Sequence, residues 1–212
     1  SADSSAAIDE LAQANSAFAF DLYHELQPTQ GNVFFSPYSL SSALAMTYAG
    51  ARGNTKSEMA EALHFSSVRE RLHQSFQELQ SKFMSLGGIR LAIANSLWPQ
   101  RDYAFLKSYV SLIENFYGSS VTPVDFKNAH EAARGAINAW TSKKTEGKIE
   151  DLIPPGILTP STRLVLVNAV YFKGNWAVPF KADQTREAPF YSEPGAQSSV
   201  PLMSQSGMFK YA

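Results

Sequence analysis

Residues 164–172 read Leu-Val-Leu-Val-Asn-Ala-Val-Tyr-Phe, an apolar run that a single amide, Asn168, interrupts. The side chains of a strand alternate between its two faces, and here both faces are apolar. This pattern predicts a strand that is covered on both sides, in the middle of a sheet. A buried amide without hydrogen-bond partners costs about 1–3 kcal/mol, so Asn168 is expected to have partners.

The composition bounds the class of protein. The chain has 212 residues, 44% of them hydrophobic, a net charge of −1 and no cysteine. That is enough for a sizeable core, in one large domain or two small ones. The charge implies no general attraction to nucleic acid or to an anionic membrane, and no apolar run reaches the roughly 18–20 residues of a membrane span. Disulfides, thiolate catalysis and cysteine-bound metal are excluded.

The N-terminal residues Ser1-Ala-Asp-Ser-Ser-Ala6 are small and polar. They are not a signal peptide, but they fit what remains after one is removed. An extracellular, secreted protein is the favoured expectation. The absence of cysteine fits a reducing compartment, which leaves a cytoplasmic location open.

Periodicity predicts a mainly helical first half. Helices are expected up to Pro28 and Gly31, from Ser36-Pro37 to Ala49, after a Thr55/Glu58 capping box, and over 72–83, 109–116 and 133–140. Strands are expected at 33–35, 89–98, 121–124, 164–172, 188–191 and 200–203. Residues 208–212 alternate like a strand, so the sequence is expected to be part of a larger fold.

Patterns typical of catalysis are sparse. The histidines have no metal-binding spacing, and solvated positions on helix faces are expected for His24, His64, His73 and His130. Neither a Gly-x-Ser-x-Gly elbow nor a phosphate-binding loop occurs. Basic residues are mixed with acidic ones, which favours a solvated face over a polyanion site.

A serine-rich helix start precedes the expected buried helix. Ser36 and Ser39 carry hydroxyls that could reach across to a sheet. A cluster of these two serines with Asn168 would satisfy all three polar groups. The alternative is an ordinary N-cap and an ordinary buried amide, each with its own partners.

Several motifs resemble the serpin family, in order and at matching spacing. The first are Asn32-Val-Phe-Phe-Ser-Pro-Tyr-Ser-Leu-Ser-Ser-Ala-Leu-Ala-Met46, Gly50-Ala-Arg-Gly-Asn-Thr55 and Glu61-Ala-Leu-His-Phe65. The others are Ile137-Asn138-x-Trp140, Thr145-x-Gly147-Lys148-Ile149, Leu166-Val-Asn-Ala-Val-Tyr-Phe-Lys-Gly-Asn-Trp176 and Val200-Pro-Leu-Met-Ser-Gln205. They run from about Ala17 to the end of the sequence and resemble only the N-terminal part of the family.

This resemblance implies an α+β serpin fold, in which helices pack on a large, mostly antiparallel central sheet accompanied by smaller sheets. Residues 1–212 would be an incomplete, N-terminal part of one such domain, without an internal domain boundary. The exposed reactive loop, with its scissile bond, and the C-terminal strands are expected on a further segment, as a separate or missing chain.

The resemblance also implies a protease inhibitor and not an enzyme. In inhibitory serpins a target serine protease, or possibly a cysteine protease, cleaves the reactive loop and forms an acyl-enzyme. The loop then inserts into the central sheet, here beside strand 164–172, and the trapped protease is distorted. Two alternatives stay open: a non-inhibitory carrier or chaperone, and an enzyme. No cofactor, metal, nucleic acid or membrane partner is expected.

Individual roles follow from the resemblance alone. Ser36, Ser39 and Asn168 match the shutter, the polar cluster under the sheet where it parts. Trp176 matches the breach, where loop insertion begins. Asn138 and Trp140 match the helix that crosses the front of the sheet.

Overall fold

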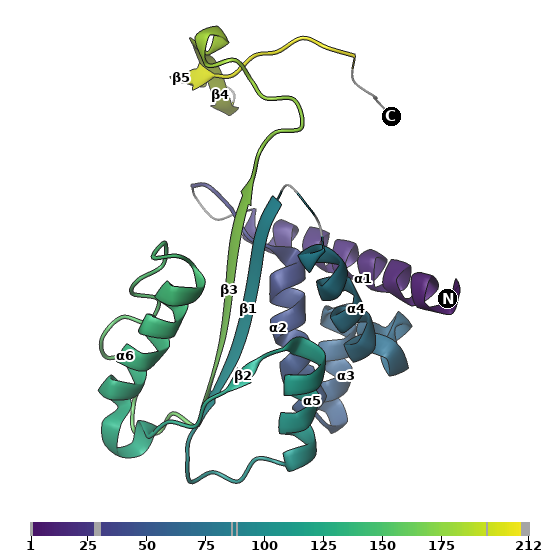
Figure 1. Cartoon of the computed structure of the whole chain (residues 1–212), viewed down its shortest axis with the longest axis vertical. Coiled ribbons are helices and arrows are strands. Elements are labelled where there is room, and N and C mark those ends of the chain that lie inside the picture. The colour runs from purple at the N-terminus through teal and green to yellow at the C-terminus, as the bar shows by residue number, and fades with distance from the viewer. Residues whose placement is uncertain (1, 28–30, 86, 88, 194, 209–212) are drawn as a thin grey trace. The chain divides into compact units, whose positions relative to one another are not determined.

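Helices cover both faces of a three-stranded sheet in the first part of the chain (Figure 1). The computed structural model describes residues 2–27, 31–85, 87, 89–193 and 195–208. Its contacts divide the chain into two compact units, residues 1–172 and 173–212, and each is described by itself. The expectation of one domain without an internal boundary concerns the complete fold, and it stays a prediction.

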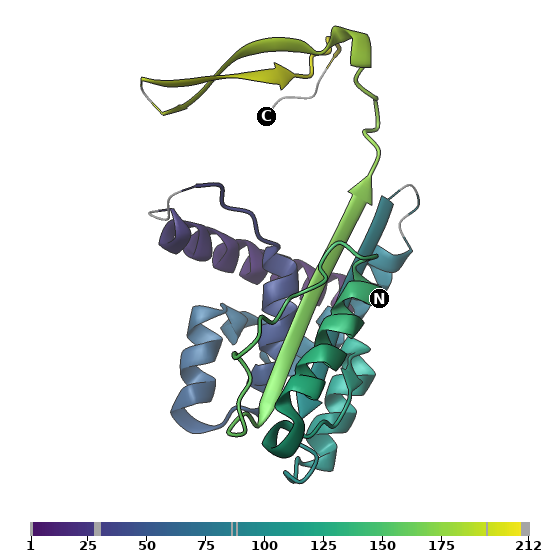
Figure 2. The same ribbon diagram turned by 90° about the vertical axis from the view of Figure 1, so that its left-hand side faces the viewer.

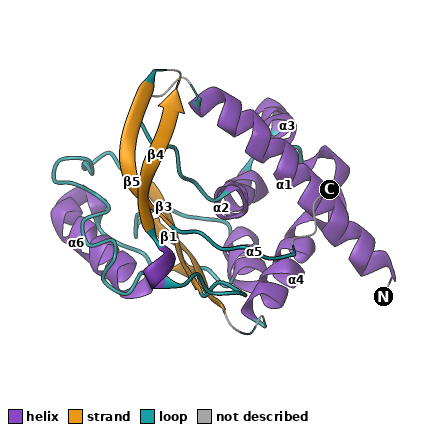
Figure 3. Ribbon diagram, turned by 90° about the horizontal axis from the view of Figure 1, so that it is seen from above, coloured by secondary structure: helices purple, strands orange, loops and turns teal. Residues whose placement is uncertain are grey.

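Five helices cluster on one side of the sheet of the first unit, and a sixth lies on the other side (Figure 3). The five are α1 (Ala2–Leu26), α2 (Pro37–Gly50), α3 (Gly53–Ala62), α4 (Leu72–Met84) and α5 (Lys107–Tyr117). The sixth is α6 (Phe126–Lys144), and short 3₁₀ turns occupy Phe65–Ser67 and Arg69–Arg71. The strands are β1 (Ile89–Pro99), β2 (Ser120–Val121) and β3 (Leu164–Gly174).

The sheet has the order β2-β1-β3. β1 and β2 are parallel, with Ser96 opposite Ser120. The Gln100 amide donates to the Arg163 carbonyl at 2.8 Å, so the end of β1 lies beside the start of β3 and these two strands are antiparallel. Within the described ranges β3 pairs only with β1, and its other edge carries no strand. In the described part of the chain β3 is therefore an edge strand, and its expected position in the middle of a sheet stays a prediction for the complete fold.

Both faces of β3 are nevertheless covered along its middle. Leu166 packs against the helix cluster, and Val165 and Val167 pack into a second core under α6. Leu164 and Phe172, near the strand ends, are exposed. The double-sided apolar pattern thus correctly predicted two covered faces, whereas it carried no information about the edges.

Helix α2 lies at the centre of the larger core. Ala45 and Met46 are fully buried, together with Leu11, Phe65 and Phe76 from the surrounding elements. Small Ser and Ala side chains along α2 allow its neighbours to approach closely. The predicted helix start is confirmed: the Ser36 side chain accepts from the Ser39 amide, and Pro37 is the first helical residue.

Two local predictions are wrong. The helix expected from a Thr55/Glu58 capping box begins at Gly53, so Thr55 lies inside its first turn and no side chain caps it. The expected strand 33–35 is a loop, in which the Phe34 side chain is 95% exposed. A strand needs the backbone of a neighbour, and no strand among the described residues pairs with this segment.

The second unit contains a hairpin. β4 (Arg186–Glu193) and β5 (Ala196–Leu202) are antiparallel, with Ala188 opposite Val200, which confirms the two short strands expected there. A 3₁₀ turn at Ala182–Gln184 precedes them. Of the terminal alternation, Met208 is exposed in a loop, and residues 209–212 lie outside the described residues. Among the helices of the described chain, none combines the length and the apolar character that a membrane crossing requires.

Candidate functional site

A polar network joins α2 to the two long strands. The Ser39 hydroxyl donates to Asn168 Oδ1 at 2.6 Å, and Asn168 Nδ2 donates to Asn95 Oδ1 at 2.7 Å. Asn95 Nδ2 in turn donates to the Ser42 hydroxyl at 3.3 Å. Ser36 takes part through the backbone, because its hydroxyl accepts from the Ser39 amide at 3.4 Å. The hydrogen bonds therefore run from α2 to β3, across to β1 and back to α2.

The register explains why the two amides meet. Gln100 and Arg163 are paired, so moving five residues back along β1 and five forward along β3 places Asn95 opposite Asn168. Both lie on the sheet face that carries Leu166 and packs on the helix cluster. Ser39 and Ser42 are three residues apart on α2, so both face the sheet.

The network contains no titratable group; three of its side chains are buried, and Asn168 and Ser36 are partly buried. Ser39 and Ser42 are each 1% exposed and Asn95 is 5% exposed. Breaking a hydrogen bond to one of these three buried side chains leaves a polar group without a partner, which costs about 1–3 kcal/mol. Hydroxyls and amides can nevertheless exchange partners when a strand shifts, whereas interdigitated apolar side chains resist sliding. The arrangement suits a contact that fastens the sheet to α2 and can be released.

Asn95 and Ser42 were not anticipated from the sequence. Asn95 interrupts the apolar alternation Ile89, Leu91, Ile93, Leu97 on the same strand face, as Asn168 interrupts its own run. Ser42 continues the three-residue spacing of Ser36 and Ser39. These two sequence patterns would have been sufficient to predict both residues as members of the polar network.

The helix on the opposite face of the sheet carries Asn138 and Trp140. Asn138 is 6% exposed and binds both backbone groups of Ile153: its Nδ2 donates to the carbonyl at 3.0 Å, and its Oδ1 accepts from the amide at 2.9 Å. The Trp140 ring packs edge-on against Trp98 of β1, with centroids 6.2 Å apart. Asn138 thus fixes the segment that follows α6, and Trp140 fixes the helix to the sheet.

The segment 149–163 returns from α6 to the start of β3 and crosses over that strand (Figure 2). Ile153 and Leu158 are buried in the core that also contains Val167 of β3. Arg134 adds a hydrogen bond from its guanidinium to the Ile153 carbonyl at 3.2 Å. Helix and return segment together form the cover of this face of β3.

Trp176 belongs to the second unit. Its ring packs edge-on against Phe180 with centroids 5.3 Å apart, and it is 62% exposed. The breach role concerns contacts beyond this unit and stays a prediction.

The histidines lie apart from the polar network. His64 pairs with Asp21 at 2.6 Å, and His73 Nδ1 lies 2.6 Å from the Tyr117 hydroxyl. His73 is half-buried, so its expected solvated position is wrong; burial, with a smaller contribution from Lys56, lowers its pKa. Burial also raises the pKa of Tyr117. No cluster of three or more potential metal ligands occurs within the described part of the chain.

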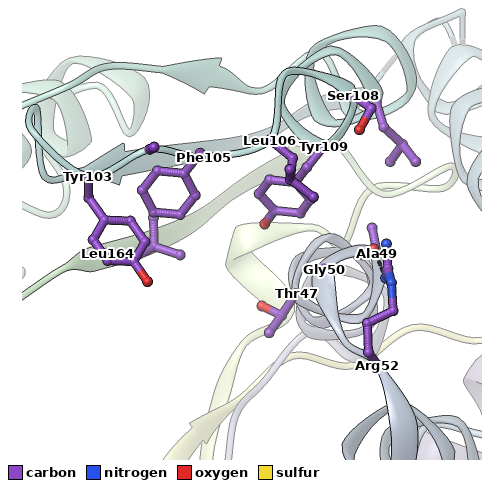
Figure 4. A pocket seen from close by; sticks show the side chains of 12 residues that line it. Thr47, Ala49, Gly50, Arg52, Tyr103, Phe105, Leu106, Ser108, Tyr109 and Leu164 are labelled. Atoms are coloured by element: carbon purple, nitrogen blue, oxygen red, sulfur yellow. Dashed lines mark hydrogen bonds between the residues drawn. The ribbon is translucent and has the colours of Figure 1, made fainter.

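A pocket of about 650 Å³ lies at the other end of α2, between Gly50, the start of α5 and Leu164 (Figure 4). Aromatic and aliphatic side chains, including Tyr103 and Tyr109, dominate its lining. Arg52 is its one charged lining residue, and its guanidinium donates to the carbonyls of Ala49 and Ala51. The pocket lining contains no histidine and no carboxylate, so it has no acid–base pair.

Comparison with known proteins identifies the family. The family model "Serpin (serine protease inhibitor)" matches residues 13–212, and the chain belongs to this family. A leukocyte elastase inhibitor from Sus scrofa is 41% identical over 207 residues, which cover 96% of this chain and 54% of that protein. One from Equus caballus is 42% identical over 208 residues, with the same coverage. The structure of emu ovalbumin superposes with a TM-score of 0.85 at 32% identity, covering 93% of this chain and 55% of that one.

These matches confirm the serpin resemblance and the incomplete serpin fold. The chain spans about half the length of the curated relatives that it matches. The activity, targets and partners of the whole protein are therefore proposals.

Proposed function

We propose that this chain is the N-terminal part of a serpin that inhibits a serine protease by the suicide mechanism. In this proposal a C-terminal segment carries the reactive loop, and a protease cleaves that loop. The cleaved loop then adds a strand to the sheet beside β3. The relatives' names point to an elastase of leukocytes as the first protease to test, with cysteine proteases as a further class. The expected secretion gains no support from these names.

The observation that carries the proposal is β3 with its polar network, a long strand that is covered on both faces and bound to α2 through Ser39 and Asn168. This strand has 11 residues, both faces covered along its middle, and one edge without a strand among the described residues. A strand added there would form roughly ten backbone hydrogen bonds. At about 0.5–1.5 kcal/mol each, they would stabilise the product by roughly 5–15 kcal/mol before any side-chain burial.

That free energy is large enough to disturb a trapped enzyme. Catalysis depends on reacting groups held close to their productive geometry, and a displacement of about 1 Å can lower the rate about a hundredfold. Dragging an acyl-enzyme along the sheet would therefore stop deacylation.

The polar network suits the role of the shutter. Ser39 and Asn168 bind directly, and Ser36 supports Ser39 through the helix cap. In this proposal the network holds β3 on α2 until insertion begins, and Asn138 and Trp140 hold the covering helix. Trp176 is proposed at the breach on the strength of its motif.

The test uses the complete serpin that contains this chain. It is incubated with leukocyte elastase and with a panel of other serine proteases, and the products are separated in SDS. We expect an SDS-stable complex with at least one protease. We also expect a large rise in melting temperature once the loop is cleaved. Cleavage of the loop without a complex and without a rise in melting temperature would favour the non-inhibitory carrier or chaperone and refute the inhibitor.

A further inference from the structure

The floor of the pocket at the C-terminal end of α2 is fixed by Tyr109 of α5. Its ring packs on α2 where Gly50 has no side chain, and a Cβ added at Gly50 would lie 3.3 Å from that ring. The Tyr109 hydroxyl donates to the Met46 carbonyl at 3.3 Å, and burial raises the pKa of this hydroxyl. Because Tyr109 is held through both its ring and its hydroxyl, the pocket is preformed, as small-molecule sites usually are.

The walls of the pocket are apolar and reach the solvent. Tyr103, Leu106 and Leu164 line it and are 56%, 68% and 38% exposed. The rings of Tyr103 and Phe105 contact each other, with centroids 5.2 Å apart. Exposed aromatic and aliphatic side chains that gather around a concave surface are typical of a ligand site.

The one charged residue among the described lining residues is Arg52. Its Nη1 donates to the carbonyls of Ala49 at 3.0 Å and Ala51 at 2.7 Å, which fixes the guanidinium at the end of α2. A guanidinium has five N–H donors, so these two hydrogen bonds leave others for an anion. Figure 4 shows Arg52 on one side of Tyr109 and the pair Tyr103 and Phe105 on the other. The lining is therefore cationic at one end and aromatic at the other.

The nearest carboxylate in the sequence is directed elsewhere. Asp102 precedes the lining residue Tyr103, but its Oδ1 accepts from Gln100 Nε2 at 2.7 Å, and both line a different depression. Gln100 is fixed in turn, because its Oε1 caps α6 by accepting from the Phe126 amide at 2.7 Å. Arg52 thus faces the pocket without a carboxylate in the lining to neutralise it.

We propose that this pocket binds an aromatic carboxylate, with its ring against Tyr103 and Phe105 and its carboxylate on Arg52. The volume of about 650 Å³ lies within the range of about 300–1,000 Å³ that holds small molecules. Aromatic rings favour edge-on and offset contacts with other rings, and a guanidinium matches the geometry of a carboxylate. Every lining residue belongs to the first unit, so the site is independent of the proposed inhibition.

Calorimetric titration of the complete serpin with 2-naphthylacetate tests the site. We expect one site per chain, with a Kd on the order of 0.1 mM for a ligand of this size. The neutral analogue 2-(2-naphthyl)ethanol keeps the ring and lacks the carboxylate. It should bind about 2- to 5-fold more weakly, because it gains no ion pair with the exposed Arg52. Hydrogen exchange should slow at residues 103–112 when 2-naphthylacetate is bound.

Single variants assign the two ends of the site. Arg52→Gln should weaken binding of 2-naphthylacetate about 2- to 5-fold and leave the alcohol unchanged, whereas Arg52→Lys should keep part of the preference for the acid. Tyr103→Ser removes an exposed ring and should weaken both probes about 2- to 10-fold. Arg90→Gln is the matched control: it removes the same charge at the start of β1, 66% exposed, and should change neither probe.

Failure of both probes to bind would overturn the site, and this is the result expected if the C-terminal segment of the complete serpin fills the pocket. Equal binding of the acid and the alcohol to the unmodified protein would overturn the preference for an anion. Binding that neither Arg52→Gln nor Tyr103→Ser changes would place the ligand elsewhere and overturn the proposal. A negative protease assay leaves all of these results unaffected.

Discussion

Replacing Asn168 by alanine should destabilise the native protein strongly for a single substitution. The substitution removes one accepted and one donated hydrogen bond, from Ser39 and to Asn95. It leaves the Ser39 hydroxyl and Asn95 Oδ1 without these partners at sites that are 1% and 5% exposed. Each stranded group costs about 1–3 kcal/mol, so with two such groups the free energy of unfolding should fall by roughly 2–6 kcal/mol.

Urea unfolding of the complete serpin measures this change, with a double-mutant cycle to isolate the contact. Ser39→Ala alone should cost about 1–3 kcal/mol. Because the two side chains bind each other, the double variant should cost less than the sum of the single ones, by about 0.5–2 kcal/mol. Asn54→Ala is the matched control: Asn54 is exposed on α3, and the change should stay within about 0.5 kcal/mol.

If Asn168→Ala lowers the free energy of unfolding by less than about 0.5 kcal/mol, the reasoning is refuted, because water would then replace the lost hydrogen bonds at almost no cost. Additive single effects would refute the direct coupling of Ser39 and Asn168 even if both variants were destabilised.

Three further outcomes are expected. Burial lowers the pKa of His73 beside Tyr117, so the folded protein disfavours the protonated ring. The free energy of unfolding should therefore be constant well above pH 6.5 and fall as the pH drops below it. In chemical unfolding at several pH values, His73→Gln should flatten this dependence. Asn138→Ala removes two hydrogen bonds to the Ile153 backbone, so the free energy of unfolding should fall by about 2–4 kcal/mol. Limited proteolysis should also cut the return segment 149–163 faster. An unchanged cleavage rate would contradict the role of Asn138 in holding this segment. The 212-residue chain expressed alone should associate and bind a hydrophobic dye, because β3 has a free edge; a monomer that unfolds cooperatively would disprove this.

Much of the local structure was predictable because its causes are local. Ser36 followed by Pro37 marks a helix start through one side-chain acceptor and one fixed dihedral angle, and both are found where expected. Alternation over 89–98 and the apolar run over 164–172 predicted two long strands, and both form. Two local predictions are wrong. Val33–Phe35 has the composition of a strand, but no strand among the described residues pairs with it, and the helix expected to be capped by Thr55 has its N-cap three residues earlier, at Arg52.

The sequence by itself determined the family, the helix and strand periods and the presence of a costly amide at Asn168, because sterics, periodicity and motif spacing act over a few neighbouring residues. Only the tertiary structure decided the partners of that amide. Asn95 lies 73 residues away from Asn168, and Gln100 lies 26 residues from the helix end that it caps. Such pairs depend on register and on packing between distant elements, which no local pattern encodes. The same limit explains why the apolar run predicted β3 as a strand with two covered faces but did not say which strand pairs with it.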